Sequence, residues 1–417
     1  MAGKRRGDWM EAVLGLGPDW RIESIERSSE KRELRVRVAK EPGAALRCPH
    51  CGRTCPGYDR RRREWRHLNA WTYRTWLVCD VPRVDCPEHG VATIQVPWAD
   101  GSSRYTVEFE AEVIEWLRDA SVSAVARRTG LSWNAVAWIM EEAVRRGLAR
   151  RKTEPARGLS VDETSFRRGH RYVTVVSNPE KGHVLHVALG RGKAALEAFF
   201  DGMDEEQLRS VESVSMDMWP AYISATLERL PGAWGKIAFD KFHVAQHLGD
   251  ALDKVRRAEH RKLVADGNPI LTGTRFQWLA GRGRKTHGEK LAFARLRSGV
   301  HSTALAWELK ETAAKLWNYR VRGWARAGWQ RWLGEAEGCG LAPVVRVAAM
   351  VRTHLWGILN AVVLRATNGP AEGINSRIKT VKVRSRGFRN PSRFANAILF
   401  HLGGLDLMPA GGASRSV

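Results

Sequence analysis

The sequence has no uninterrupted apolar run close to the roughly 20 residues that a membrane-spanning helix needs. Its first residues, MAGKRRGDWMEAVLGLGPDW, are basic but lack the apolar centre and the cleavage site of a secretory signal. Cysteine is scarce, with six among 417 residues, and five of the six lie between Cys48 and Cys86. These absences argue against membrane insertion and against a disulfide-stapled secreted domain. We expect a cytoplasmic, nucleoid-associated protein with reduced thiols and no membrane partner.

Acidic residues are also in short supply, since 45 face 68 basic ones and the net charge is +23. Most of the excess is arginine, whose planar, permanently charged group suits phosphate. A field of this sign concentrates polyanions, so nucleic acid is the expected partner. A merely soluble or ribosome-associated basic protein is the alternative. A single core rarely grows beyond about 250–300 residues, so two or more domains are expected.

The first 100 residues carry the clustered cysteines. Residues 22–39 alternate as one strand does, residues 47–68 suggest a basic loop, and residues 71–97 suggest further strands. Cys48 and Cys51 form the pair CPHC, while Cys86 and His89 form CPEH. Two such pairs can close a tetrahedral Zn²⁺ site once the chain between them folds back. Cys55 and Cys79 are not needed for these two pairs. Either both are small core residues, or one of them replaces His89 as a metal ligand. Buried free thiols without metal are the alternative.

Residues 101–152 change to helical spacing of apolar residues. Within SVSAVARRTGLSWNAVAWIMEEA we predict a helix, a tight turn at Thr129–Leu131 and a second helix capped by Ser132. This is the helix-turn-helix pattern, whose second helix enters the DNA major groove from its N-terminal end. Ser132, Trp133 and Asn134 are the candidate DNA contacts. An ordinary helical hairpin would give the same pattern.

Beyond residue 153 the chain alternates between strands and helices. We predict three strands with a hairpin turn at residues 179–182, then helix, strand, helix and strand, which is an α/β unit with a mixed sheet. A long helical stretch follows, with seven tryptophans from Trp278 to Trp356 among many arginines. These tryptophans either stack on DNA or form a helical core with arginines at its surface. The last residues, 409–417, are predicted to be disordered.

Three acidic residues stand out in this α/β unit. Asp162 ends the first predicted strand and Asp217 the fourth, and ligands bind at the carboxyl ends of strands in open α/β sheets. Two aspartates meeting there need a divalent cation between them, which two-metal phosphodiester chemistry would use. Glu372 is the candidate third ligand, and the basic run after it suits DNA. Alternatively, Glu372 only complements a helix dipole and Asp217 only caps a helix. Glu163 is predicted to face the other way.

Taken together, these segments resemble the DDE transposases of the bacterial ISL3 insertion-sequence family over nearly the whole chain. The residues that carry the resemblance are VDETSFRRGHRYVTVV, SMDMWPAYI, FDKFHV and NGPAEGINSRIKTVKVRSRGFRN, preceded by the cysteine ribbon and the helix-turn-helix. The resemblance implies an RNase H-like core interrupted by a helical insertion, with the two aspartate strands side by side. The implied divisions are ribbon 1–100, helix-turn-helix 101–152, core 153–242, insertion 243–362, last core helix 363–408 and tail 409–417.

The resemblance also implies roles for individual residues. Asp162, Asp217 and Glu372 match the DDE triad that holds Mg²⁺ or Mn²⁺, and Asp240 and His243 match a DxxH motif. The family's ribbon often ends in two cysteines, where this chain has Cys86 and His89. Contacts to DNA are expected from the basic residues of the last helix: Lys379, Lys382, Arg384 and Arg386.

The implied activity is Mg²⁺-dependent cleavage at the ends of an insertion sequence, followed by attack of the freed 3′-hydroxyl on target DNA. The ribbon and the helix-turn-helix would read terminal inverted repeats, and joining two ends calls for a dimer or larger assembly. Two alternatives remain at this point. A non-catalytic DNA-binding regulator would not need the acidic trio, and an RNase H-like nuclease of repair would not need two site-reading modules.

Overall fold

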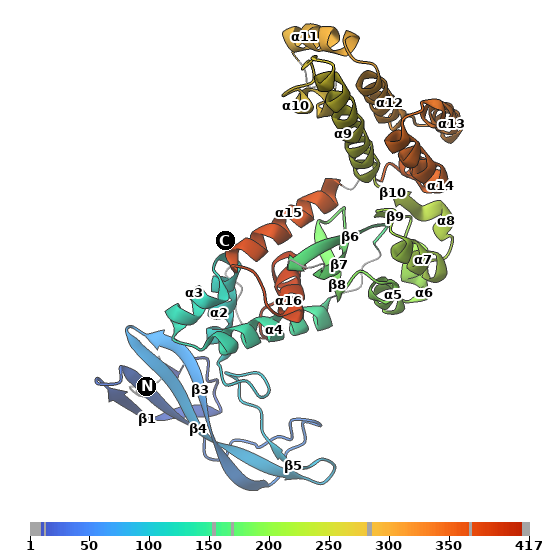
Figure 1. Ribbon diagram of the computed structural model, residues 1–417. Coiled ribbons are helices and arrows are strands. Elements are labelled where there is room, and N and C mark those ends of the chain that lie inside the picture. The colour runs from blue at the N-terminus through green and yellow to red at the C-terminus, as the bar shows by residue number, and fades with distance from the viewer. Residues whose placement is uncertain are drawn as a thin grey trace. The chain divides into compact units, whose positions relative to one another are not determined.

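The structure is a computed structural model that describes residues 10–11, 14–151, 156–167, 171–281, 286–366 and 369–410. The chain divides into two compact units (Figure 1). The first comprises residues 1–151 together with 405–417, and the second comprises residues 152–404. The predicted tail, 409–417, falls mostly outside the described residues, and so does Asn368, a plausible cap for the last core helix.

The first unit begins with a sheet in the order β1-β2-β4-β3, and β5 pairs with the end of β4. Its strands are β1 (Trp20–Ser28), β2 (Glu33–Lys40), β3 (Gly57–Ala70), β4 (Tyr73–Cys86) and β5 (Gly90–Thr93). The single strand predicted over 22–39 is therefore wrong: the chain turns back after Ser28 and forms an antiparallel hairpin. The polar stretch SSEKR supplies that turn.

The predicted basic loop is also wrong, because most of it forms the 14-residue strand β3. This strand lies at the edge of the sheet and pairs antiparallel with β4. Its arginines tolerate an edge position because charged side chains can stay in water there. Trp65 is fully buried beneath them and packs edge-on against Trp98, with ring centroids 5.6 Å apart. The run of arginines therefore masked the alternating pattern of this strand in the sequence, although its inward-facing Trp65 is apolar.

Three helices complete the first unit: α2 (Val107–Asp119), α3 (Val122–Thr129) and α4 (Trp133–Arg150). Helix α3 ends at Gly130, whose φ of 71° is the left-handed conformation that glycine adopts easily. A buried ion pair between Glu110 on α2 and Arg146 on α4, with atoms 3.0 Å apart, joins the outer helices. The predicted helix, turn and helix are confirmed.

The second unit holds a five-stranded sheet in the order β10-β9-β6-β7-β8. The strands are β6 (Gly158–Arg167), β7 (Arg171–Asn178), β8 (His183–Leu189), β9 (Ser213–Met216) and β10 (Ile237–Phe239). β6, β7 and β8 are antiparallel neighbours, whereas β9 is parallel to β6 and β10 is parallel to β9. This is the mixed sheet expected of an RNase H-like core, and the two aspartate strands are neighbours as predicted.

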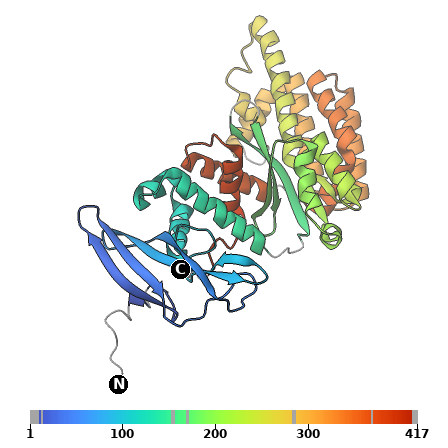
Figure 2. The same ribbon diagram turned by 90° about the horizontal axis from the view of Figure 1, so that it is seen from below.

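Helices cover both faces of this sheet (Figure 2). One face packs its apolar residues against α5 (Lys193–Asp201) and α7 (Pro220–Arg229), which are followed by the short α6 (Glu205–Ser210) and α8 (Ala233–Lys236). The opposite face, with Val173 and Val175, packs against α15 (Gly369–Arg384) and α16 (Pro391–Leu402). The helix at the end of the domain is thus held directly on the strands that begin it.

The long helical stretch between β10 and α15 is an insertion of packed helices. It contains α9 (Lys241–Ala265), α10 (Arg275–Leu279), α11 (His287–Ser298), α12 (Ser302–Leu316), α13 (Arg322–Gly338) and α14 (Ala342–Leu364). Trp278, Trp307, Trp329 and Trp332 are almost fully buried in its core. The core interpretation therefore holds for these four residues, and Trp324, which is 69% exposed, is an exception.

Helix α14 sits tightly on strand β10. The amide of Asn360, which is buried, donates to the carbonyl oxygens of Trp234 and Ile237 at 2.7 and 2.8 Å. Gly357 lies so close to Phe239 that a Cβ atom there would overlap the ring. The insertion is therefore attached to the edge of the sheet by hydrogen bonds from a side-chain amide to backbone carbonyls and by direct packing.

One helix, α14, is long and apolar enough to cross a bilayer by length and composition, with a mean hydropathy of 1.5 over its best 18-residue window. Arg346 and Arg352 interrupt the run, which is why the sequence shows no continuous apolar segment. Half of that window is buried inside the protein, as in the core helix of a globular domain.

Candidate functional site

The four predicted zinc ligands come together in the first unit. The ligand atoms of Cys48, Cys51, Cys86 and His89 all lie within 4.8 Å of one another. Cys51 Sγ is 3.8 Å from Cys86 Sγ, and His89 Nδ1 is 3.6 Å from Cys86 Sγ. A tetrahedral zinc with Zn–S bonds of about 2.3 Å holds its sulfurs about 3.8 Å apart, so the group fits the ion. Cys86 and His89 lie at the turn between β4 and β5, and the antiparallel pairing of β3 with β4 brings the preceding segment, with Cys48 and Cys51, alongside them.

The two surplus thiols of the ribbon lie outside this cluster. Cys55 is buried and donates to the carbonyl of Arg53, while burial raises the pKa of Cys79 to about 12. Within the cluster, the hydrogen bond from His89 lowers the pKa of Cys86 to about 6. A thiolate at neutral pH is the form that binds metal. His89 therefore belongs to the cluster, and no cysteine replaces it.

The start of α4 presents the residues predicted to contact DNA. Ser132 caps the helix by accepting a hydrogen bond from the backbone N–H of Ala135 at 3.1 Å. Trp133 is 38% exposed and Asn134 is also exposed. Both side chains are accessible at the N-terminal end of α4, which is the end that a recognition helix presents to the major groove.

The two aspartates are set by the pairing of β6 with β9. The parallel register stops at Ser160↔Ser215, and each aspartate lies two residues beyond its strand's last partner. The prediction that Asp162 ends its strand is wrong, because β6 continues to Arg167 paired with β7 alone. Asp162 is thus at the end of the parallel pairing, not of the strand. Asp217 directly follows β9, as predicted.

Both aspartates are held in a low-dielectric position. Burial, together with the nearby charge of Asp217, raises the pKa of Asp162 to about 6. The hydrogen bond that its carboxylate accepts from the backbone N–H of Glu163 at 2.7 Å partly opposes this rise. Burial likewise raises the pKa of Asp217, and the charge of Asp240 adds to this rise. His243 lowers both pKa values through its charge. Ionisation of each carboxyl group is disfavoured in this environment, so a cation bound between the two would stabilise their charged forms.

The DxxH pair lies beside them. Asp240, which is 4% exposed, caps α9 by accepting a hydrogen bond from the N–H of Phe242 at 3.1 Å. Its own backbone N–H donates to the carbonyl of Met216, the residue before Asp217, at 3.0 Å. Asp240 and His243 therefore lie near the aspartates, and Asp240 also has a structural role in starting the insertion.

Glu372 lies in the first turn of α15 and is exposed. One turn later, Asn375 donates from Nδ2 to Oδ2 of Asp162 at 2.6 Å, so the start of this helix lies over the end of the parallel pairing. Among the described residues, the cysteine–histidine cluster is the one group of three or more potential ligands gathered within 4.8 Å. Asp162 and Asp217 thus lie close together and Glu372 begins the helix that contacts Asp162 through Asn375, but the three acids do not all lie within 4.8 Å of one another.

Sequence reasoning missed two side chains of this site. Asn375 shares a helix face with Glu372, and that spacing of three residues was the available signal. Arg191 forms an ion pair with Glu163 at 3.4 Å and lies 4.6 Å from the centre of the Trp219 ring. Its charge lowers the pKa of Asp217. Glu163, predicted to face away, is close enough for Asp217 to raise its pKa.

The basic residues after Glu372 lie along α15 and the turn that follows it. Lys379, Arg384 and Arg386 are exposed, and Lys382 donates to the carbonyl oxygen of Ser165 on β6 at 2.8 Å. Lys382 is therefore partly committed to holding α15 on the sheet. The other three present positive charge to solvent in the same domain as the acids, which suits phosphate contacts.

Comparison with known families decides what this arrangement is. Residues 159–398, more than half of the chain, match the transposase domain of the ISL3 DDE family. Residues 94–144 match the helix-turn-helix domain of transposase family ISL3, and residues 45–89 match the zinc-finger of the transposases IS204, IS1001, IS1096 and IS1165. The chain belongs to the ISL3 family of transposases. It is a DDE transposase of insertion sequences, an enzyme that cuts and joins DNA.

Full-length relatives agree with this assignment. The transposase for insertion sequence element IS1557 of Mycobacterium tuberculosis is 28% identical over 430 residues, covering 94% of this chain and 95% of the relative. The transposase for insertion sequence element IS1001 of Bordetella parapertussis is 26% identical over 386 residues, covering 91% and 95%. The similarity of this transposase therefore extends through the ribbon, the helix-turn-helix, the core and the insertion.

The zinc ribbon makes a first prediction. We expect one zinc per chain in the wild type and less than about one-tenth of that in the double variant Cys48→Ser, Cys51→Ser, because two of four ligands are removed. Metal analysis of purified protein measures it. The matched control is Cys55→Ser, which removes a ribbon thiol outside the cluster and should keep its zinc. Full zinc content in the double variant would show that the metal is held elsewhere.

The buried aspartates make a second prediction. With a folded-state pKa near 6 against an ordinary value of 3.8, Asp162 lowers the free energy of unfolding as pH rises from about 4 to 6 and keeps it low above 6. Asp162→Asn removes this penalty, on the order of 1–3 kcal/mol. In metal-free buffer its melting temperature should exceed that of the wild type by a few degrees at pH 7.5 and by roughly half as much at pH 5.

The control for this measurement is Asp250→Asn, which changes an exposed carboxylate on α9 and should not shift the melting temperature at either pH. If Asp162→Asn melted below the wild type at pH 7.5, the carboxylate would be stabilising the fold and our account of the site's electrostatics would be wrong.

Proposed function

We propose that this transposase uses Asp162, Asp217 and Glu372 to hold divalent magnesium, with Mn²⁺ as a substitute, while it cuts the ends of its element and joins them to target DNA. The observation that carries the proposal is the pair of partly buried aspartates at the end of the β6–β9 pairing, both with raised pKa values. Carboxylate oxygens are the ligands that Mg²⁺ prefers. Magnesium bound there would lower the pKa of an attacking water and stabilise the leaving oxygen.

The reaction conserves phosphodiester bonds in its joining step. Water first breaks a P–O3′ bond at the element end and leaves a 3′-hydroxyl on one side and a 5′-phosphate on the other. That 3′-hydroxyl then attacks a target phosphorus in line, forming one P–O bond as another breaks and releasing a target 3′-hydroxyl. No covalent bond to the protein is needed at either step.

The chain's own residues would position this chemistry. The distance between Glu372 and the aspartates would close as α15 settles on DNA, and Asn375 would keep the Asp162 carboxylate turned toward the site. Arg191 and His243 lie close enough to shift the pKa values of the acids. They would therefore offset negative charge as the phosphate arrives.

The remaining DNA contacts follow from the two units. Ser132, Trp133 and Asn134 would enter the major groove at the terminal inverted repeats, next to a zinc-bound ribbon. Lys379, Lys382, Arg384 and Arg386 would contact the backbone of the strand being cut. Because two element ends must be joined, the active form would be a dimer or a larger assembly on DNA.

The triad makes a third prediction. Asp162→Asn, Asp217→Asn and Glu372→Gln should each lower Mg²⁺-dependent cleavage and strand transfer by at least about 100-fold, since each removes a ligand. His243→Gln should cost less, about 10- to 100-fold. Gel assays on a duplex that carries the element's end measure both steps, and the mass of the protein–DNA complex gives the number of chains.

A second readout separates metal binding from activity. Mg²⁺ should raise the melting temperature of the wild type and of Asp250→Asn but not that of Asp217→Asn. All variants should bind the metal-free duplex as the wild type does. A Glu372→Gln protein that cut and joined at the wild-type rate would remove Glu372 from the triad.

A further inference from the structure

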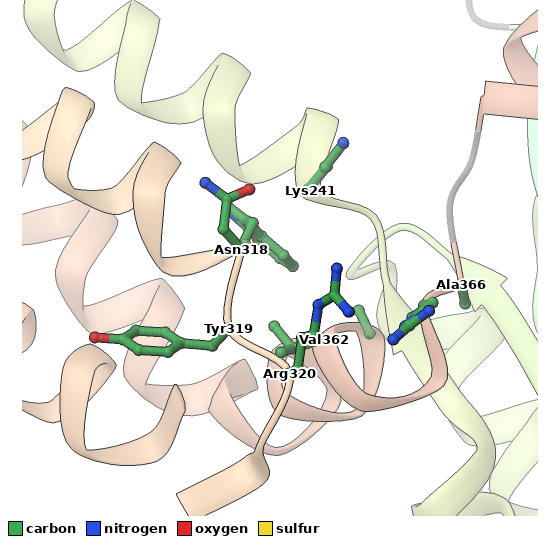
Figure 3. Close-up of a pocket in the computed structure, with 9 residues that line it drawn as sticks. Lys241, Asn318, Tyr319, Arg320, Val362 and Ala366 are labelled. Atoms are coloured by element: carbon green, nitrogen blue, oxygen red, sulfur yellow. The ribbon is translucent and has the colours of Figure 1, made fainter. Parts of the chain in front are cut away.

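A hollow of about 390 Å³ opens in the helical insertion, beside the C-terminal end of α14 (Figure 3). Three segments line it: Lys241 at the start of α9, residues 317–320 between α12 and α13, and residues 361–366 at the end of α14. Figure 3 shows Lys241 and Arg320 at its edge on different elements, with the Lys241 side chain directed outward and Tyr319 pointing away. The hollow thus gathers residues that are far apart in the sequence.

The charged residues of this hollow are all cationic. Lys241, Arg320 and Arg365 line it, and no lining residue is acidic. Within the described chain, none of the three forms an ion pair or a side-chain hydrogen bond, whereas the nearby Arg322 is engaged by Asn360 at 2.8 Å. Three cations without a counter-charge, around one concavity, produce a local positive potential that favours an anion.

The backbone at Arg365 gives a separate indication. This residue ends α14 with φ 51° and ψ 27°, the left-handed conformation in which glycine or asparagine is usual. An arginine there bears a strain that a glycine would not. Strained positions cluster where a side chain is needed for binding.

The hollow begins beside the acidic site. Lys241 follows Asp240, whose N–H is bonded to the carbonyl of Met216, and His243 acts on the pKa values of both aspartates. A DNA strand held at the aspartates would therefore continue past Lys241. Trp317 in the wall is half-buried and packs edge-on against Trp329 at 5.5 Å, which leaves part of an aromatic ring for a base.

We propose that this hollow binds the sugar–phosphate of one nucleotide of single-stranded DNA next to the strand that the acids cut. Its volume is that of a small-molecule pocket of roughly 300–1,000 Å³, which admits one nucleotide and not a duplex. Lys241, Arg320 and Arg365 take the phosphate, and the ring of Trp317 takes the base. The inference rests on the proposed function and extends it, because it names a binding site for single-stranded DNA beside the acidic residues.

The fourth prediction tests this with Arg320→Ala combined with Arg365→Gly, where glycine suits the left-handed backbone. Anisotropy of a fluorescein-labelled 12-nucleotide oligo-dT, measured without divalent metal, should show at least 10-fold weaker binding. The slope of log K against log salt should shrink by roughly 0.7, the change expected when one phosphate is no longer neutralised. Inorganic phosphate should compete for wild-type protein more than for the variant.

The matched control is Arg331→Ala, which removes an exposed arginine of α13 outside the hollow and should bind as the wild type does. Equal weakening in the control and the double variant, or equal weakening for a blunt duplex, would overturn the proposal by showing only general charge attraction. Because no metal is present, failure of the triad variants to lose cleavage would not affect this result.

A different observation carries a second inference, in the first unit. Trp71 occupies the two-residue turn between β3 and β4 and is 88% exposed, with φ 54°. The second residue of the next strand is Arg74, whose N–H donates to the carbonyl of Arg32 at 2.9 Å. Arg74 also lies beside the helix-turn-helix, since its Cδ is 4.0 Å from where a Cβ of Gly130 would be.

A highly exposed aromatic side chain at a hairpin tip with a strained backbone, three residues before an arginine that lies beside the helix-turn-helix, has the features of an intercalating wedge. Apolar side chains of this kind unstack a base step and bend the duplex. We infer that Trp71 inserts into DNA beside the site contacted by α4. A turn without this role would be better served by glycine, which adopts this φ without strain.

Trp71→Gly gives the fifth prediction. The variant should melt at the same temperature as the wild type or higher, yet bind a metal-free duplex carrying the element's end at least 10-fold more weakly. Energy transfer between dyes at the two ends of that duplex should report less bending, and Trp71→Phe should restore most of it. Wild-type affinity and bending in Trp71→Gly would refute the inference, and neither measurement involves the acidic residues.

Discussion

The short parallel pairing between β6 and β9 is the constraint on which the catalytic unit depends. It spans only Gly158↔Ser213 to Ser160↔Ser215, and the aspartates follow immediately on both strands. Hydrogen bonds between backbones fix strand spacing to about 4.8 Å, so this ladder brings two carboxylates together that are more than 50 residues apart in the sequence. Their raised pKa values, the neighbouring His243 and Arg191, and the Asn375 hydrogen bond all follow from this placement.

Charge in this transposase is divided between two uses. Many arginines form surface ion pairs, such as Arg352 with Glu337 at 2.7 Å and Arg145 with Glu142 at 2.6 Å, which contribute little to stability. The excess that gives +23 is of another kind, because cations such as Arg320 and Arg365 line a concavity without an acidic partner. A protein whose substrate supplies the missing negative charge can leave such groups uncompensated until it binds.

Much of this architecture could be predicted from the sequence, and the limits have physical causes. The paired metal ligands and the Ser132 cap are local patterns, so the ribbon and the helix-turn-helix were predictable. Asp162 and Asp217 were identified from strand order, yet the continuation of β6 to Arg167 was not, because it depends on pairing with β7. Strand β3 was missed since its arginines hide the alternation. Asn375, Arg191 and the cationic hollow arise from tertiary contacts that no spacing encodes.

The packing of α14 on β10 has a consequence for how the activity of such transposases can change between copies. The chain passes through the insertion before it returns to the sheet as α15, and the last helix of the insertion is fixed by Asn360 and by the close approach of Gly357 to Phe239. A change at this contact would alter how α14 packs on the sheet and where α15 begins, at residues that are not among the acidic ones. Natural variation in activity among copies of such an element can therefore originate far from every catalytic group, in how one helix rests on one strand.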